Sequence, residues 1–378
     1  MVDLGGGVPT ILHWGDVLGT TSALGSLGAA LERPVGAGAM DAVAPLSVVP
    51  QHADGFPGRP GLSGRRPGGR SWAPRFAPAG DRIDGTAVVG DVVDDHAGLS
   101  LRVTLDLGDV LAVSATLTNT DPTTRYVLDA LTLTLPLPQH AEELLTFGGR
   151  WAREFHPVRE PWSHGVHAIE NRRGRTSHEA PPVWFTGEHG FGEWHGEVWG
   201  AHLAWSGNHI MLAERLADGR RYLQAGELLH PGEVVLEAGE SYTTPALLAV
   251  YSNEGLTPAT WGFHRSLRRR PQHPSTPRPV LLNTWEAVYF RHDHDRLRAL
   301  ADAAAEVGIE RFVLDDGWFG SRRDDRSGLG DWVVSADVYP DGLSPLIEYV
   351  TGLGMEFGIW VEPEMVNPDS DLYRAHPE

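Results

Sequence analysis

Carboxylates and tryptophans follow three apolar segments in the C-terminal part of the sequence. Trp285 ends the first segment, Asp315 and Asp316 end the second, and Trp360 lies in the third. Carboxylates accept hydrogen bonds from hydroxyl groups, and the face of an indole ring covers the apolar C–H side of a sugar. These residue types therefore predict a site that binds a carbohydrate.

Each acidic group also has a structural interpretation. Asp315 and Asp316 in DDGW are compatible with a helix cap or a buried salt bridge. We favour ligand binding, because two adjacent acids at a strand end rarely both have a structural role. Facing a wet pocket, they should contribute little to folding stability. For Glu362 and Glu364 we favour a salt bridge or a hydrogen bond to a neighbouring loop, because Pro363 stiffens that turn.

The histidines and arginines have structural interpretations too. The segment HDHD at 292–295 is typical of a capped, acidic first helical turn rather than a cation site. The arginines of 64–70 and 171–175 are expected to anchor loops through bidentate pairs with carboxylates rather than to bind anions. Four further histidines lie among strand and turn signals, which favours satisfied or surface side chains over zinc ligands: His189, His195, His202 and His209.

Strand and helix signals alternate after residue 280. Apolar runs predict strands and amphipathic runs predict helices, an order that indicates right-handed βαβ units and a parallel sheet. The sheet is either a small open one or the first three-eighths of a (β/α)8 barrel. Either topology brings the strand ends, and thus the acids and tryptophans, to one face. The segments are RPVLLNTW, DHDRLRALADAAAEVG, IERFVLDD, SPLIEYVTGLG and MEFGIWVEPE.

The preceding chain shows a different pattern. Alternating runs rich in Val, Leu and Thr recur from about residue 80 to 250 and predict an antiparallel β-sandwich. Residues 52–80 are crowded with Gly, Pro and Arg and predict a long surface loop or intersubunit arm. A helix follows, with Thr257 as N-cap and Pro258 at its first position. The expected domains are a sandwich over 1–255, a linking helix and Pro-rich joint over 256–279, and the start of a barrel over 280–378.

Composition narrows the class of protein. The 378 residues include 50 acidic and 31 basic side chains, giving a formal charge of −19, which disfavours nucleic acid and anionic membranes as partners. The absence of Cys excludes disulfides and thiolate sites. The first residues have neither a basic segment nor a long apolar run, so we expect a cytoplasmic protein.

The motifs LDDGWFG, LGDW, NTWEAVYF and FGIWVEPEMVNPDSDLYRAHPE together resemble the α-galactosidases of glycoside hydrolase family 36. Upstream, GGRWAREFHPVREPWSHGVHAIENRRGRTSHEAPPVWF and GEVWGAHLAWSGN resemble the N-terminal sandwich of the same family. The likeness runs from about residue 145 to the last residue. It implies a retaining enzyme that releases terminal α-1,6-linked galactose from melibiose or raffinose-type sugars, and it implies no cofactor.

The resemblance also implies roles for individual residues. Asp315 and Asp316 correspond to the pair that binds the galactose hydroxyls at positions four and six, and Trp285 and Trp360 to aromatic side chains of the pocket. Asp54, on the Gly/Pro/Arg-rich loop, corresponds to an acid that reaches a neighbouring subunit's pocket in the family's homotetramers. The expected substrate-binding residues are therefore these five, with no metal ligand among them.

The catalytic acids of the family do not appear in this sequence. Its nucleophile lies in a Lys-Trp-Asp motif on a later strand, with the acid/base later still, and this chain contains no Lys. The resemblance thus implies a chain that ends at Glu378 after the third barrel strand, holds only the substrate-binding half of the site and is inactive alone. An α-N-acetylgalactosaminidase, a raffinose-type galactosyl transferase and a non-catalytic carbohydrate-binding fragment stay as alternatives.

Overall fold

The computed structural model describes residues 1–19, 38 and 43–377, which form two compact units. The first unit comprises Met1–His273 and the second Pro274–Glu378. The boundary lies inside the Pro-rich segment PQHPSTPRP, where frequent prolines limit regular hydrogen bonding. Each unit has its own hydrophobic core.

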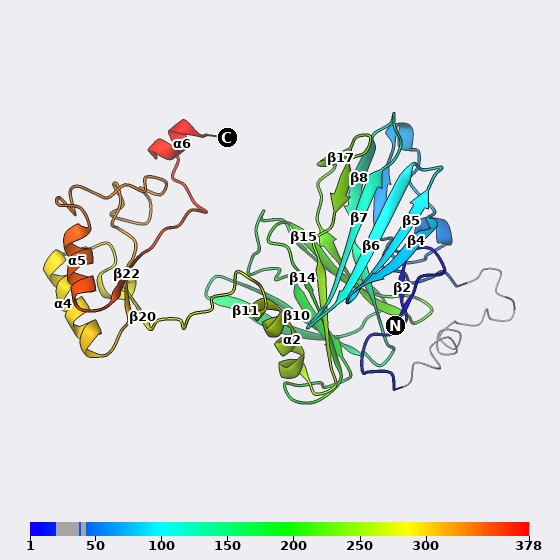
Figure 1. The fold of residues 1–378 in the computed structure, drawn as a ribbon, viewed down its shortest axis with the longest axis horizontal. Coiled ribbons are helices and arrows are strands. Elements are labelled where there is room, and N and C mark those ends of the chain that lie inside the picture. Colours follow the sequence, from blue (N-terminus) through cyan, green and yellow to red (C-terminus); the bar gives the residue numbers. More distant parts are fainter. Residues whose placement is uncertain (20–37, 39–42, 378) are drawn as a thin grey trace. The chain divides into compact units, whose positions relative to one another are not determined.

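A ten-stranded antiparallel sheet dominates the first unit (Figure 1). Some of its strands alternate between buried and accessible residues, as in LSLRVTLDL over Leu99–Leu107, because successive side chains of a strand point to opposite faces. In spatial order the strands are β11 (Arg153–Pro161), β10 (Glu143–Arg150), β13 (Val183–Gly187), β14 (Val198–Leu203), β19 (Leu247–Ser252), β7 (Leu111–Asn119), β6 (Leu99–Leu107), β5 (Ala87–Asp94) and β4 (Ala77–Asp84), with β18 (Ser241–Thr243) beside β7.

Smaller sheets complete the sandwich. A single core joins Leu117 of the large sheet to Leu128 and Leu223 of two smaller ones, and all three side chains are buried. Each fully buried leucine contributes about 1.5–3 kcal/mol. The predicted β-sandwich is therefore confirmed. The smaller sheets are β12 (Gly165–Asn171), β15 (His209–Arg215), β16 (Arg221–Glu227) and β9 (Leu133–Leu137); β17 (Val234–Leu236), β8 (Tyr126–Leu131) and β3 (Leu62–Arg65); and β1 (Val2–Asp3) with β2 (Thr10–Ile11).

The Gly/Pro/Arg-rich stretch over 52–80 is more regular than predicted. It contains the 3-10 helices η2 (His52–Asp54) and η3 (Pro67–Gly69), the strand β3 and the start of β4. β3 pairs with β8, and a side chain at Gly64 would lie only 2.6 Å from the Tyr126 ring. Glycine at this position permits the close approach of the two strands, so here it supports a ladder rather than breaking it.

Helix α2 (Leu256–Arg268) belongs to the first unit, where it contacts β14 and β19. Its N-cap is Gly255, with φ 96°, and not the predicted Thr257. The first amide donors are satisfied by backbone instead, because Leu256 and Thr257 donate to the carbonyls of Gly192 and Glu193 at 2.9 Å. The Thr257 hydroxyl donates to the Glu193 carboxylate at 2.9 Å, which leaves it unable to cap the helix.

The second unit contains the predicted βαβ units. Its three strands are parallel in the order β20-β21-β22, and α4 and α5 lie on one face of the sheet (Figure 1). The elements are β20 (Leu281–Asn283), α3 (Trp285–Val288), α4 (His294–Glu306), β21 (Arg311–Leu314), α5 (Ser344–Gly352), β22 (Glu356–Ile359) and α6 (Asp371–Ala375). No helix of the described residues is long and apolar enough to cross a membrane.

Candidate functional site

The carboxyl ends of β20, β21 and β22 meet at one edge of the parallel sheet, as the strand register requires. Asp315 and Asp316 directly follow β21, and Trp360 directly follows β22. Backbone bonds fix these ends, since the Trp360 amide donates to the Leu314 carbonyl at 2.9 Å. Ligands of parallel α/β sheets bind at this edge.

Asp315 is buried and held from two sides. It is 7% exposed, and its carboxylate accepts hydrogen bonds from the Asn283 side-chain amide and from the Asp316 backbone amide, the latter at 2.6 Å. Its own amide donates to the Thr284 hydroxyl at 3.0 Å. These contacts orient the carboxylate and leave lone pairs on its oxygens for a ligand.

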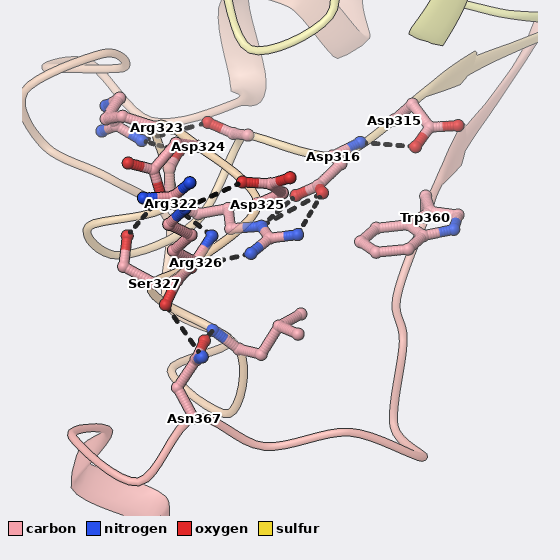
Figure 2. A network of polar contacts seen from close by, with 12 residues as sticks. Asp315, Asp316, Arg322, Arg323, Asp324, Asp325, Arg326, Ser327, Trp360 and Asn367 are labelled. Carbon is pink, nitrogen blue, oxygen red and sulfur yellow. Dashed lines mark hydrogen bonds and ion pairs between the residues drawn. The ribbon is translucent and has the colours of Figure 1, made fainter.

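Asp316 forms an ion pair with Arg322. Nε of Arg322 lies 3.0 Å from one carboxylate oxygen of Asp316, and Nη2 lies 2.8 Å from the other. Both residues are 5% exposed. Figure 2 shows the two acids pointing apart, Asp316 toward the Arg322 guanidinium and Asp315 away from it. The structure therefore differs from the expectation of a wet pocket, because both acids are buried and Asp316 is ion-paired. The contribution of each acid to stability stays a prediction.

The sequence patterns did not predict a role for Asn283 or Arg322. Asn283 joins two predicted residues, because its Nδ2 donates to Asp315 and its Oδ1 accepts from the Trp285 amide at 2.8 Å. Arg322 has a visible signal, since it follows the acid pair closely in DDGWFGSRRDD. The sequence does not indicate, however, which of Arg322 and Arg323 turns inward.

The two tryptophans occupy different surroundings. Trp285 begins α3 and is half-buried, with its ring edge-on to Tyr289 and Phe290 at 5.1 Å. Trp360 is also half-buried and lies 6.5 Å from Phe319 in a stacked orientation. Figure 2 shows Trp360 and Asp315, which follow the neighbouring strands β22 and β21. Aromatic and carboxylate groups therefore share the β21–β22 end of the sheet.

Glu362 and Glu364 do not have the predicted structural partners. Within the described residues neither carboxylate forms a hydrogen bond or an ion pair. Burial raises the pKa of Glu362, and the charges of Glu364 and Asp316 raise it further, whereas Arg322 lowers it. The Glu362 carboxyl therefore lies within the electrostatic field of the Asp316–Arg322 pair.

Asp54 lies in the first unit, at the end of η2. Its carboxylate accepts a hydrogen bond from the Gln51 side chain at 3.1 Å and lies 3.5 Å from Nε of Arg75. The other four predicted residues lie in the second unit. The structure thus brings Asp315, Asp316, Trp285 and Trp360 to one sheet edge and places Asp54 in the sandwich.

His202 and His209 have the hydrogen-bond partners that their predicted structural roles require. His202 Nδ1 lies 3.0 Å from the Pro182 carbonyl, and both nitrogens of His209 contact backbone carbonyls. Asp293 caps α4 by accepting a hydrogen bond from the Arg296 amide at 2.8 Å, as HDHD predicts. No group of three or more acids and histidines within the described residues is arranged to hold a metal ion.

Both arginine stretches contain a pair with a carboxylate, and in the first Arg65 pairs with Asp129. Arg173 forms the predicted bidentate pair with Glu179. Arg66 does not pair with a carboxylate: it is buried and donates to the Ala97 carbonyl at 2.9 Å and to the Asn119 side chain at 2.9 Å. These carbonyl and amide oxygens satisfy the guanidinium donors of Arg66.

The chain matches two family models over nearly its full length. The glycosyl hydrolase family 36 N-terminal domain matches residues 7–237, and the melibiase model matches residues 241–378. An α-galactosidase of Escherichia coli is 44% identical over 374 residues, covering 97% of this chain and 52% of that protein. AgaA of Geobacillus stearothermophilus is 38% identical over 298 residues, covering 76% of this chain and 41% of AgaA.

Solved structures agree with the sequence matches. A variant of AgaA in complex with 1-deoxygalactonojirimycin superposes with a TM-score of 0.88 at 29% identity, covering all of this chain and 56% of that one. Another AgaA variant, in complex with raffinose, gives a TM-score of 0.87 at 29% identity with the same coverage. The chain spans about half the length of the curated relatives it matches. On these matches and on the sandwich and βαβ architecture, this chain belongs to glycosyl hydrolase family 36.

Proposed function

We propose that this protein is a retaining α-galactosidase that releases terminal α-1,6-linked galactose from melibiose and raffinose-type oligosaccharides. One observation carries the proposal: two buried acids and a tryptophan share one edge of the parallel sheet, on a chain of this family. Asp315 and Asp316 bind the galactose hydroxyls at positions four and six, and Trp285 and Trp360 cover the apolar side of the ring.

The placement of the acids suits discrimination between sugars. Galactose and glucose differ only in the orientation of the fourth hydroxyl. A carboxylate held in one orientation forms a charge-assisted hydrogen bond with a hydroxyl in the correct position. A hydroxyl in the wrong position stays without a partner. Asn283 holds Asp315 and Arg322 holds Asp316, so both carboxylates are oriented before a sugar arrives.

In the enzyme that we propose, two further carboxylates outside residues 1–378 cleave the bond. In a retaining mechanism one attacks the anomeric carbon and the other protonates the leaving oxygen, with the two groups about 5–5.5 Å apart. Protonation and carboxylate attack suffice for this reaction, so no cofactor is required. Residues 1–378 supply recognition of the sugar.

Two related activities compete with this one on the same scaffold. An α-N-acetylgalactosaminidase would accept an acetamido group at position two, and a raffinose-type galactosyl transferase would pass the galactosyl group to a sugar instead of water. Variants of the α-galactosidase AgaA were solved with raffinose and stachyose, which favours galactose over N-acetylgalactosamine as the sugar recognised. We also propose that the enzyme is a homotetramer in which Asp54 contributes to the neighbouring subunit's pocket.

Hydrolysis by the protein expressed from its complete coding sequence tests the proposal. We expect nitrophenol release from the α-galactoside, little from the α-glucoside and the α-N-acetylgalactosaminide, and galactose with retained configuration in the NMR spectrum. Asp315→Asn should lower kcat/KM for galactosides by about 100-fold. Residues 1–378 by themselves should release no nitrophenol. Absence of galactose release by the complete protein would refute the proposal, and new oligosaccharides would favour the transferase.

A further inference from the structure

The carboxylate of Asp316 is held by a forked donor. Nε and Nη2 of Arg322 contact both carboxylate oxygens, at 3.0 Å, 3.1 Å and 2.8 Å. Rotation of an aspartate carboxylate is otherwise a soft, roughly two-fold motion. A planar guanidinium that bonds both oxygens defines the plane of the carboxylate, which a single point charge such as a lysine cannot do.

Arg322 is in turn held by groups other than Asp316. Its Nη1 donates to the Ser327 carbonyl at 3.0 Å, and its guanidinium carbon lies 5.4 Å from the centre of the Phe290 ring. Gly328 adopts φ 86° directly against the Arg322 backbone, where an added Cβ would lie 2.8 Å from the Arg322 nitrogen. The loop therefore surrounds Arg322 and directs its guanidinium toward Asp316.

Stability alone is a weak reason for this arrangement. The side chains of Arg322 and Asp316 are 6% and 7% exposed, and burying two charges costs desolvation that their mutual attraction offsets only in part. Well-packed apolar residues of similar volume are often at least as stabilising. What the ion pair adds is a fixed direction for the lone pairs of Asp316 that Arg322 does not occupy.

From these contacts we infer that Arg322 is a positioning residue: it orients Asp316 toward one hydroxyl of the galactosyl group and thereby contributes to sugar specificity. The inference rests on the proposed function. Arg322 acts through Asp316 and contacts no substrate itself. Its substitution should consequently matter only for substrates that carry the hydroxyl that Asp316 binds.

A double-mutant cycle in the protein expressed from its complete coding sequence tests the inference. Arg322→Gln should lower kcat/KM for nitrophenyl α-galactoside by about 10- to 100-fold. Added to Asp316→Asn, the same change should cost no more than about threefold, because Asp316 has already lost its charge. Arg326→Gln is the matched control, because Arg326 lies in the same loop with its side chain 90% exposed. We expect the kcat/KM of this variant to stay within about twofold of the wild-type value.

Substrates that lack one hydroxyl separate positioning from general damage. The 4-deoxy and 6-deoxy derivatives of nitrophenyl α-galactoside each remove one candidate partner of Asp316. For one of them Arg322→Gln should have nearly the same kcat/KM as the wild type. Equal losses on all three substrates, or losses that multiply in the cycle, would overturn the inference, as would an unchanged Arg322→Gln rate.

Folding is monitored by thermal unfolding of every variant. If Arg322→Gln does not fold, Arg322→Lys takes its place in the cycle, because lysine keeps the charge and loses the fork. It should show a smaller loss with the same dependence on the substrate's hydroxyls. A wild-type protein without α-galactosidase activity would refute the proposed function, whereas an active wild type with an insensitive Arg322 would refute only the positioning role.

Discussion

At the scale of single residues, Asp315 and Asp316 are adjacent in the chain but differ in what holds them. Asp315 accepts hydrogen bonds from neutral donors, the Asn283 side chain and a backbone amide. Asp316 balances the charge of buried Arg322. Neutralising the two acids should therefore have unequal effects on stability.

We expect Asp316→Asn to lower the free energy of unfolding by about 3–5 kcal/mol, because it leaves the Arg322 charge buried without a partner. Asp315→Asn should cost only about 0.5–1.5 kcal/mol, the net value of an ordinary hydrogen bond. Urea unfolding monitored by tryptophan fluorescence measures both. In the double variant Asp316→Asn with Arg322→Gln, part of the loss should be recovered. Equal midpoints for the two single variants would contradict this prediction.

We predict that stability depends on pH through the buried side chain of His292. His292 is 8% exposed, and its Nδ1 lies 2.7 Å from the Tyr339 hydroxyl. Burial lowers its pKa from the ordinary 6.5, and the backbone groups of Asp316 and Tyr289 oppose this shift in part. Below its ordinary pKa the unfolded chain therefore binds a proton that the folded protein resists. Stability should fall as the pH decreases through that range.

We expect His292→Gln to lose less stability than the wild type between about pH 7 and pH 5, since glutamine does not titrate. Urea unfolding at a series of pH values gives the two slopes. The variant also serves as its own control for other titrating groups, which both proteins share. Parallel slopes would show that His292 is charged as readily in the folded protein as in the unfolded chain.

At the scale of elements, the site depends on the loop between β21 and α5. The loop is attached to the segment after β22 through Asn367, whose side chain donates to the Arg326 carbonyl at 3.0 Å and accepts from the Leu329 amide at 2.7 Å (Figure 2). A third bond joins the Asn367 amide to the Leu329 carbonyl at 2.9 Å. Two loops that are distant in sequence therefore maintain the position of Arg322 together.

Gly328→Ala should disturb this loop more than a conformational penalty alone explains. An alanine there would adopt a left-handed φ and place its Cβ 2.8 Å from the Arg322 backbone nitrogen. The matched control is Gly342→Ala, at φ 71° with open space around the added Cβ. We expect both to cost roughly 1–3 kcal/mol of strain, and only Gly328→Ala to lower kcat/KM as well. Equal activity of the two variants would indicate that the loop yields without moving Arg322.

At the scale of the whole molecule, the chain divides where its sequence is richest in proline. Each unit has a separate core, and the segment around 271–279 is exposed for most of its length. Exposed backbone with few hydrogen bonds is the preferred substrate of proteases. The three parallel strands of the second unit have unpaired outer edges among the described residues, which lowers the stability of a sheet.

We expect proteinase K to cut residues 1–378 within 271–279 and to leave a resistant core of Met1–His273. Arg278 within this segment and Arg270 just before it both precede proline, where trypsin cuts poorly. A protease of broad specificity is therefore the better probe. Mass spectrometry of the fragments identifies the cut. The exposed stretch 172–176 in the sandwich is the internal comparison. A first cut there, or equal resistance of both units, would contradict the prediction.

The sequence by itself determined the architecture and the identity of the acids. Alternation of period two between turn residues predicted the sandwich, and alternating strand and helix signals predicted the parallel sheet, because these periodicities follow from local backbone geometry. Since the ends of parallel strands meet at one edge, the positions of Asp315, Asp316 and Trp360 in the chain also predicted that they lie at the same end of the sheet.

Only the tertiary structure decided how those residues are held. The ion pair of Asp316 with Arg322 depends on a loop that turns back at Gly328 and is tied down by Asn367. The start of α2 depends on carbonyls of a loop more than sixty residues earlier in the chain. Such contacts depend on the path of irregular loops, and these loops have no repeating pattern in the sequence. The burial and pairing of the charged groups in the site can therefore be seen only in the folded structure.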